Sequence, residues 1–454
     1  MNICRPGLPD VYLNGIWDFK SEADENWTSI RVPGAYTGVR KGWGGSRWDC
    51  FDYPREWEDR GGVYRRTFTV PDYMNGHNIR FFCGACAHHS IVYLNEKKVG
   101  EWHDGYTPME FPLGPELTQG ENLLEIRVSA RKNSLFDDYG TYRRGIWQDC
   151  CIRAYPELSV ENDLFITTSV FSGEIRCDIP VSNLTGTGQG FTAVCVIRDR
   201  YGSEAARFSS ERLFLEAGSC ETFRLVHKWP DPVLWFPHDP FLYELYIQIR
   251  AENARIIDNC RQRFGFREIT WEGPHLYING RELFLRGHGG HYMGDLQGSR
   301  PYMEAWLGQM KKMGINFMRL HCSPKHRELY DVADEIGIML ESEAVCHFRV
   351  PENERVWKGH IERLVKEQRN HPSVIVWSVS NELRWRGGGE KPEMIEWVKQ
   401  FDTTRPVFAS DFSCESRHGD ICGHHYDPLS VFDDWKKYGP DKPMKWDELG
   451  SVWQ

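Results

Sequence analysis

The sequence lacks any segment suited to entering or crossing a membrane. No apolar stretch approaches the ~20 residues that a membrane-spanning helix needs. The first residues, MNICRPGLPDVYLNG, lack the charged start and apolar run of a signal peptide. We therefore expect no membrane partner and a cytoplasmic protein, or a periplasmic or secreted one if a signal peptide has been removed.

The sequence also lacks an excess of positive charge. It holds 65 acidic and 55 basic residues, which gives a formal net charge of −10. Nucleic acids bind basic surfaces, so this balance argues against nucleic acid as the partner.

The 14 cysteines lack the spacing of a disulfide scaffold or of a zinc site. Cys83 and Cys86 form one CxxC and are followed by His88 and His89, but no second CxxC or HxxxH lies at the usual distance. We expect structural cysteines that are mostly reduced.

The length of 454 residues is enough for about three domains. Residues 1–156 contain short strand-like runs bounded by turns, such as GGVYRRTFTV and NLLEIRVSA, which predict a jelly-roll β-sandwich. Residues 157–268 contain further runs, such as EIRCDIPVSN and LYELYIQIRA, and their length suits an immunoglobulin-like sandwich.

Strand-like and helical runs alternate over residues 269–454. Leu329, Val332, Ala333 and Ile336 share one helical face, and further helices are expected from about Pro301 and across 394–401. This alternation predicts a (β/α)8 TIM barrel, while a doubly wound open sheet is an alternative that no GxGxxG or P-loop motif supports. The candidate strands lie near 283–287, 315–321, 337–342, 374–380, 406–411, 421–425 and 443–448.

Polar residues fall where these strands end. In HPSVIVWSVSNELRW, residues 371–385, Asn381 and Glu382 come directly after a buried strand. One such residue alone could be a capping or salt-bridge residue, but a ring of them at the carboxyl ends of barrel strands predicts an active site. The candidates at the other strand ends are His288, His291, Arg319, His321, Glu341, Glu343, Asp411, His424, His425, Tyr426, Asp447 and Glu448.

Two carboxylates that face each other across a pocket can cleave a glycosidic bond. One protonates the leaving oxygen, and the other attacks the anomeric carbon when the two lie about 5–5.5 Å apart. Strands four and seven lie on opposite sides of an eight-stranded barrel. Glu382 and Glu448, at the ends of these strands, are therefore expected to face each other.

Several segments resemble glycoside hydrolase family 2, the family of β-galactosidases, β-glucuronidases and β-mannosidases. HPSVIVWSVSNEL is similar to its acid/base segment and DKPMKWDELG to its nucleophile segment. GGVYRRTFTV, IVYLNEKKVGEWHDGYTPMEF and YRRGIWQD are similar to its N-terminal sugar-binding-type sandwich. LFLRGHGGHY and MKKMGINFMRLHCSPKHRELYDVADEIGIMLESEA are similar to its first three barrel strands, so the resemblance covers essentially the whole chain.

The resemblance implies a retaining exo-β-glycosidase that removes terminal sugars from oligosaccharides or glycoconjugates by double displacement. Glu382 would be the general acid/base and Glu448 the nucleophile. Asn381 would bond the sugar 2-hydroxyl, Tyr426 would orient the nucleophile, and Arg319 would keep Glu448 ionised. The expected substrate-binding residues are Asn381, Arg319, His321, His288, His291, Asp411, His425, Tyr426 and Trp385.

Departures from the family motifs leave the sugar open. The second strand ends in His321-Cys322-Ser323-Pro324, where many β-galactosidases have Ser-His-Tyr-Pro, and the Asn-x-Lys pair of β-glucuronidases is not evident after Glu382. We expect β-galactosidase-like activity. The alternatives are β-mannosidase, exo-β-glucosaminidase, arabinosidase-like or β-glucuronidase activity, or a non-catalytic carbohydrate-binding protein.

Cleavage by two carboxylates needs no cofactor, so we expect no catalytic metal and no organic cofactor. Glu343 resembles a carboxylate that binds magnesium in some relatives. A structural Mg²⁺ or Ca²⁺ near it is therefore an alternative to a purely structural or substrate-binding role.

The barrel region is about 185 residues long, shorter than the ~250 residues typical of this fold. No eighth strand is visible after Glu448, so the barrel is expected to be truncated after strand seven. We expect that strands one and seven do not pair. The gap is expected to be filled by another polypeptide segment, such as a missing C-terminal one, or to be left as a solvent-exposed, poorly ordered edge, and a homo-oligomer is the alternative expected for the partner. The isolated chain is then expected to be weakly active at best and to self-associate through the open edge.

Overall fold

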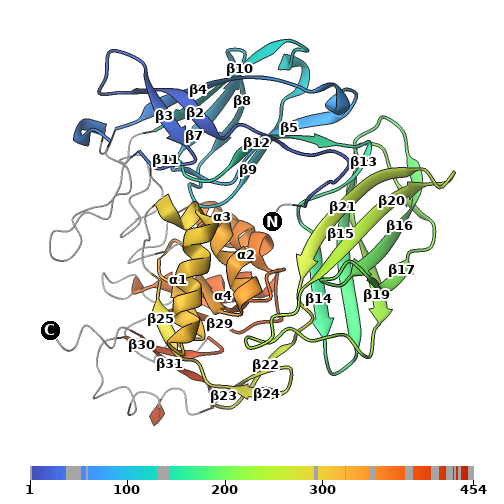
Figure 1. Cartoon of the computed structure of the whole chain (residues 1–454), viewed down its shortest axis with the longest axis vertical. Coiled ribbons are helices and arrows are strands. Elements are labelled where there is room, and N and C mark those ends of the chain that lie inside the picture. Colours follow the sequence, from blue (N-terminus) through green and yellow to red (C-terminus); the bar gives the residue numbers. More distant parts are fainter. Residues whose placement is uncertain are drawn as a thin grey trace.

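The protein consists of three bodies, and Figure 1 shows their arrangement in the computed structural model. A jelly roll, in blue, lies over the helices of a barrel, in yellow to red, and an immunoglobulin-like sandwich, in green, lies beside them. All three expected folds are confirmed. The structure describes residues 3–36, 53–57, 60–129, 144–290, 295–322, 324–346, 353–383, 392–410, 419–425, 433, 436–437 and 441–447.

The jelly roll is built from two main sheets and one short strand pair, and inward-facing side chains such as Trp17, Phe19 and Phe81 form one apolar core. Short strands with alternating buried and exposed residues produce this arrangement because each sheet has one dry face. The six-stranded sheet has the order β3 (Thr28–Val32), β2 (Gly15–Ser21), β4 (Gly62–Thr69), β10 (Glu121–Val128), β7 (Ser90–Leu94), β8 (Lys97–Trp102). The other sheets are β1 (Val11–Tyr12), β12 (Cys150–Tyr155), β5 (Asn78–Cys83) and β9 (Met109–Pro112), and the pair β11 (Gly145–Ile146) and β6 (Cys86–Ala87).

The cysteines of the CxxC lie inside this first sandwich. Cys83 and Cys86 are buried free thiols. Burial is the main cause, and the neighbouring Cys83 the second, that raises the pKa of Cys86 well above its usual value. Such thiols stay protonated and pack as small apolar side chains.

The second sandwich also encloses a core between two sheets, with alternate residues of the long strands facing inward. One sheet contains β13 (Leu158–Val160), β15 (Glu174–Asn183), β14 (Phe165–Ser169) and β19 (Cys220–Lys228). The other contains β17 (Glu204–Ser209), β16 (Gln189–Arg198), β18 (Leu213–Leu215), β20 (Tyr243–Ala251) and β21 (Ile256–Phe264).

The expected first barrel strand lies in a different place. Arg281–Leu283 forms β24 of a small antiparallel sheet with β22 (Ile269–Glu272) and β23 (His275–Ile278). A two-residue turn joins β23 to β24, with Asn279 and Gly280 both at positive φ, at 53° and 75°. Asn-Gly turns of this kind produce tight hairpins, so the expectation of a barrel strand at 283–287 was wrong and the first barrel strand is β25 (Gly287–Gly289).

Seven parallel strands of the barrel are present in the described part of the chain. β25, β26 (Phe317–Leu320), β27 (Met339–Glu343), β28 (Val374–Asn381) and β29 (Val407–Ser410) form one sheet in this order. β30 (Cys422–His425) pairs with β31 (Met444–Asp447). Among the described residues no pairing joins β25 to β31, as expected, and the segment that would fill this gap stays a prediction.

Helices cover the outer face of these strands. The expected helices are α1 (Arg300–Lys312), α2 (Arg327–Ile336) and α4 (Pro392–Lys399), whose apolar faces pack onto one core with β26, β27 and β28. A fourth helix, α3 (Glu354–Gln368), was not among those expected. None of the helices in the described ranges is both long and apolar enough to span a bilayer.

Buried charged groups join the three bodies. Arg5 pairs with Asp258 of the second sandwich, with its Nε 3.0 Å from Oδ1. Asp104 of the jelly roll accepts from His360 and Arg363 of α3, at 3.0 Å each. These contacts hold the N-terminal part of the chain against the second sandwich and against a barrel helix.

Asp402 generates a testable prediction because it is a buried carboxylate at the loop before β29. Its oxygens accept from Thr404 N at 2.8 Å, from Trp377 Nε1 at 2.9 Å and from Arg405. Burial acts to raise the pKa of Asp402, but Arg405 and these donors outweigh it, and the pKa lies below its usual value. The stabilisation is therefore complete above the unfolded pKa of about 3.9 and is lost as the pH falls toward the folded pKa.

We expect Asp402→Asn to lower the free energy of unfolding by about 2 kcal/mol at pH 7, measured by urea unfolding. The difference from the wild type should shrink below about pH 4. Asp239→Asn is the matched control, since Asp239 is exposed and pairs with an exposed Arg200. An equal loss in both variants, or a loss unchanged at pH 3, would contradict this role.

Candidate active site

Strand β28 carries Asn381 and Glu382 to the carboxyl end of the barrel. All eight residues of the strand are buried, as expected for a parallel strand covered on both faces. Glu382, directly after the strand, is 5% exposed and has a positive φ of 51°. Non-glycine residues seldom adopt this conformation, and such strain gathers at functional sites.

Asn381 is held from both sides. Its Nδ2 donates to Glu382 Oε2 at 3.1 Å, and its Oδ1 accepts from Arg319 of β26. Its backbone N–H donates to the carbonyl of Cys346 at 2.8 Å. Because Oδ1 faces a guanidinium, the amide NH₂ must point toward Glu382.

Glu343, at the end of β27, fixes Arg319. Its Oε2 accepts from Arg319 Nε at 3.0 Å and Nη2 at 2.8 Å, and from Ser378 Oγ at 3.1 Å. Its Oε1 accepts from the backbone N–H of Cys322 at 2.6 Å. Both oxygens are therefore occupied by donors of this chain, and the geometry supports a positioning role for Glu343 more than magnesium binding.

His321 and Cys322 lie beside this cluster, after β26. His321 Nε2 is 3.3 Å from the Cys322 sulfur, and the His321 carbonyl accepts from Lys325 Nζ at 2.8 Å. Burial, and after it the charge of Glu343, raises the pKa of the Cys322 thiol well above its usual value. A protonated thiol is a poor nucleophile, so the Cys-His contact does not resemble that of a thiol enzyme.

None of the described contacts joins His288 to Asn381, Arg319 or Glu343. Its ring is edge-on to that of Trp306 on α1, with ring centres 6.1 Å apart. The contact places the His288 ring toward the helix that follows its strand, and burial there lowers the pKa of His288.

The remaining candidates lie partly or wholly outside the described residues. The backbone of His425 ends β30, opposite Asp447 of β31, and its side chain is not described. Strand β31 ends at Asp447, one residue before Glu448. The candidates wholly outside the described residues are His291, Asp411, Tyr426, Trp385 and Glu448, so the expected pairing of Glu382 with Glu448 stays a prediction.

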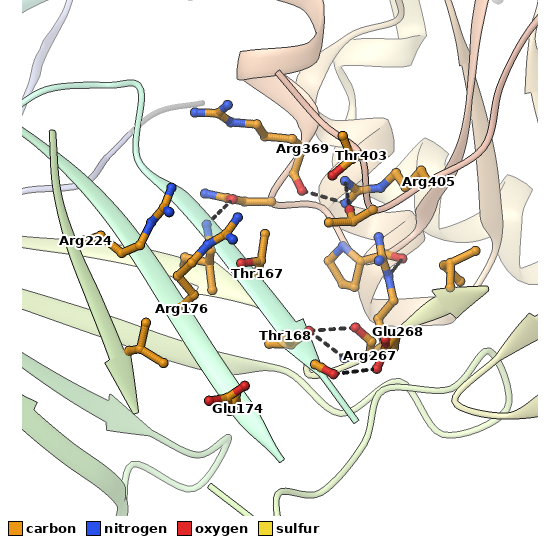
Figure 2. Close-up of a pocket in the computed structure, with 18 residues that line it drawn as sticks. Thr167, Thr168, Glu174, Arg176, Arg224, Arg267, Glu268, Arg369, Thr403 and Arg405 are labelled. Atoms are coloured by element: carbon orange, nitrogen blue, oxygen red, sulfur yellow. Dashed lines mark hydrogen bonds between the residues drawn. The ribbon is translucent and has the colours of Figure 1, made fainter. Parts of the chain in front are cut away.

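A pocket of about 580 Å³ lies at the other end of the barrel strands, against the second sandwich (Figure 2). Arginines line it, but Arg224, Arg369 and Arg405 pair with Asp178, Asp163 and Asp402. Arg267 donates to the carbonyls of Pro372 and Val374, at 3.1 and 3.0 Å. These contacts make the pocket a joint between two domains and do not supply a facing pair of carboxylates.

Sequence reasoning missed the partners of these residues. It named Glu343 but not its bond to Arg319, because that contact depends on the register of β27 against β26. It also missed a cluster of His89, Glu101 and His103 in the jelly roll. The register of the β7–β8 hairpin could have indicated it.

The cluster at the barrel mouth generates a prediction for Arg319. Arg319→Met should cost about 3–5 kcal/mol of unfolding free energy, because it leaves Glu343 buried without its positive partner. Arg319→Met combined with Glu343→Leu should cost less than the sum of the two single changes. Arg212→Met is the control, since Arg212 and Glu252 form an ion pair that is 71% and 60% exposed. Urea unfolding measures all four variants, and strict additivity would contradict the coupling.

The chain matches three models of one family along almost its whole described length. These are the sugar binding domain of the glycosyl hydrolases family 2 at residues 12–156, the model described simply as glycosyl hydrolases family 2 at 158–267, and the family's TIM barrel domain at 269–443.

Relatives of known name are similar over most of this chain. A β-galactosidase of Oenococcus oeni is 26% identical over 77% of this chain and 36% of its own length. A putative β-glucuronidase of Formosa agariphila is 27% identical over 86% of this chain and 38% of its own length. The chain thus spans well under half the length of these curated relatives. The solved structure of a putative β-galactosidase from Bacteroides fragilis, 18% identical, superimposes with a TM-score of 0.82 over 97% of this chain and 71% of that one. The three family models, matched in sequence order over most of the chain, show that it belongs to glycosyl hydrolases family 2.

Proposed function

We propose that the complete protein is a retaining exo-β-glycosidase in which Glu382 is the general acid/base and Glu448 the nucleophile. The observation that carries the proposal is the buried Glu382 carboxyl at the carboxyl end of β28, held by Asn381 at 3.1 Å. Membership of the family supports the reaction class.

In the first step Glu448 attacks the anomeric carbon and forms a glycosyl ester, while Glu382 gives its proton to the leaving oxygen. In the second step Glu382 takes a proton from water, and the water oxygen replaces Glu448 at the anomeric carbon. The sugar leaves with its original configuration, and both carboxyls return to their starting state.

Asn381 is proposed to bond the sugar 2-hydroxyl. Arg319 holds its Oδ1, so the NH₂ group is the part left to donate toward Glu382 and the sugar. A pre-oriented donor costs no reorganisation when the bond strengthens in the transition state. We assign Arg319 a positioning role through Asn381, in addition to the expected charge effect on Glu448.

The proposed substrate is a terminal β-galactoside. The name of the Oenococcus oeni relative supports this choice, and the name of the Formosa agariphila relative keeps a β-glucuronide as the second candidate. Cys322 takes the place of a histidine found in many β-galactosidases, so binding of the sugar differs there. A non-catalytic carbohydrate-binding protein is the alternative of a different class.

The two carboxylates are predicted to respond differently to the leaving group. Glu382→Ala should reduce hydrolysis of poor leaving groups by about 10²–10⁴-fold, spare activated aryl glycosides in the first step, and regain turnover with azide. Glu448→Gln should abolish activity on both. Steady-state kinetics on a pair of aryl β-glycosides tests this, with Glu354→Gln as a control on the exposed start of α3. Equal losses on good and poor leaving groups would exclude Glu382 as the acid.

The sugar and the stereochemistry can be tested together. We expect a panel of aryl β-glycosides to show highest kcat/KM for the galactoside, and proton NMR to detect the β-anomer as the first product. EDTA treatment should leave these rates unchanged, because the two carboxyls supply the proton transfer and the nucleophile. A first-formed α-anomer would refute retention, whereas preference for the glucuronide would change only the sugar.

A further inference from the structure

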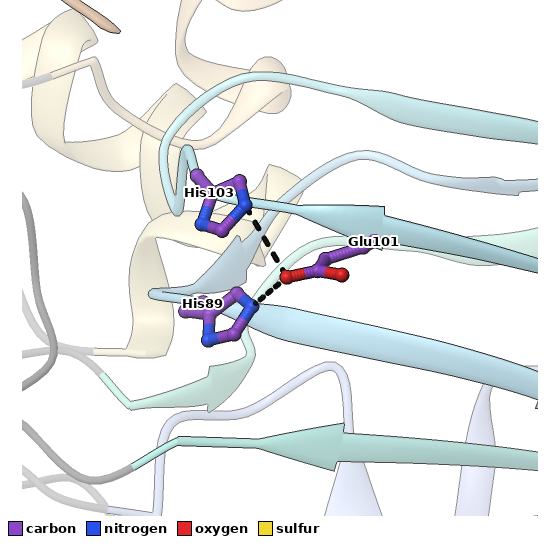
Figure 3. Close-up of side chains that lie close together, drawn as sticks. All are labelled: His89, Glu101 and His103. Atoms are coloured by element: carbon purple, nitrogen blue, oxygen red, sulfur yellow. Dashed lines mark hydrogen bonds and ion pairs between the residues drawn. The ribbon is translucent and has the colours of Figure 1, made fainter.

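Three side chains of the jelly roll converge at the end of the β7–β8 hairpin. In Figure 3, one ring nitrogen of His89 and one of His103 point toward the same carboxylate oxygen of Glu101. Glu101 Oε1 is 2.8 Å from His89 Nε2 and 3.3 Å from His103 Nε2. The two imidazole rings stack with centres 4.4 Å apart.

The sequence places these residues together through the hairpin register. Asn95 and Glu96 form the turn at positive φ, and Ser90 lies opposite Trp102 on the ladder. Continuing the ladder by one residue puts His89 opposite His103. Since side chains two residues apart share a face, Glu101 lies on the same face as both histidines.

The spacing suits one small metal ion. Two donors on a tetrahedral zinc ion, with bonds of about 2.0–2.1 Å, lie roughly 3.3 Å apart. The ligand atoms of this cluster all lie within 4.8 Å of one another. His103 Nε2 and Glu101 Oε1 are 3.3 Å apart, which is the separation of two donors on zinc. Side-chain exposures of 19% for His89 and 54% for His103 leave access for the ion and for a water as fourth ligand.

Neighbouring groups orient the donors. His89 Nδ1 is 2.9 Å from Ser129 Oγ, which can accept the Nδ1 proton and leave the Nε2 lone pair for a metal. Lys98 Nζ lies 2.5 Å from Glu101 Oε2, so Oε1 is the oxygen left to coordinate. Histidine and carboxylate ligands in metal sites are typically held by such partners.

A second group of possible ligands among the described residues does not carry the same inference. Asp331, Asp334 and His371 also lie close together. However, Arg263 Nη2 is 2.8 Å from Asp331, and Ser373 N–H donates to Asp334 at 3.0 Å. Arg263 Nη2 is also 3.9 Å from Asp334 Oδ2, so one guanidinium lies against both carboxylates of this group, whereas Lys98 contacts only the Glu101 oxygen that does not face the histidines.

We propose that His89, Glu101 and His103 form a structural site for a divalent transition ion, with Zn²⁺ as the fitting ion. Two imidazoles and one carboxylate suit zinc, whereas Mg²⁺ and Ca²⁺ prefer oxygen ligands alone. The ion ties the last residues of β8 to the start of β7. His103 precedes Asp104, which binds α3, so the ion also steadies the loop that joins the jelly roll to the barrel.

Zinc titration with a chromophoric zinc indicator tests the proposal on the whole chain. We expect the wild type to bind one more tight equivalent of Zn²⁺ than His89→Ala or His103→Ala. Glu101→Gln and Ser129→Ala should each weaken that equivalent by about tenfold or more. His275→Ala is the matched control, because His275 is an exposed histidine that contacts one carboxylate, Glu282, at 2.6 Å.

Thermal unfolding gives a second readout. Zinc at about 100 times its Kd should raise the Tm of the wild type and of His275→Ala by about 5 °C, but not that of His103→Ala. The Tm without zinc shows whether each variant is folded. Equal zinc stoichiometry and equal Tm shifts in the wild type and His103→Ala would overturn the proposal, as would full displacement of the zinc by magnesium.

Discussion

The mouth of the barrel depends on the buried ion pair between Arg319 and Glu343. The pair joins β26 to β27, and the bond from Arg319 to Asn381 extends it to β28. A buried ion pair adds little net stability because both groups lose their hydration, but its bonds are directional. One guanidinium therefore fixes the ends of three neighbouring strands and, through the Asn381 amide, the group that contacts Glu382.

The parallel strands could be predicted because their environment leaves a clear pattern. VIVWSVS in β28 contains no charged residue, since helices cover one side of the strand and the barrel interior the other. Leu283 belongs to a similar apolar run, but the Asn279-Gly280 turn before it folds the run back into a hairpin. The turn was visible in the sequence, and turn chemistry overrides an apolar run of three or four residues. Helix α3 was also within reach, because Trp357, Ile361, Leu364 and Val365 have helical spacing and are buried.

The site could be predicted only in part, for a different reason. Asn381 ends a buried strand and Glu382 follows it, so their position is a property of one segment. The contact between Arg319 and Glu343 depends on two segments. In the register of β26 against β27, Arg319 lies opposite Glu341, and its side chain reaches Glu343 two residues further along. The same holds for His89 and His103, which are brought together by the hairpin. Contacts across strands need a register, and a sequence indicates register only through its turns.

The contacts between the jelly roll and the barrel extend to the end of the barrel that carries Glu343. Val345, two residues after Glu343, packs in a small cluster with Tyr106 and Trp147 of the jelly roll. Its N–H donates to His360 Nε2 at 3.1 Å, so His360 must donate from Nδ1 to Asp104.

Helix α3, which carries His360, lies in the chain between β27 and β28. The jelly roll therefore holds both the residues that follow Glu343 and the helix that precedes Asn381. A rotation of the sandwich would break a buried Asp–His–amide chain, whereas a purely apolar surface would permit sliding. The jelly roll thus acts on the active-site end of the barrel because it fixes the segment between β27 and β28.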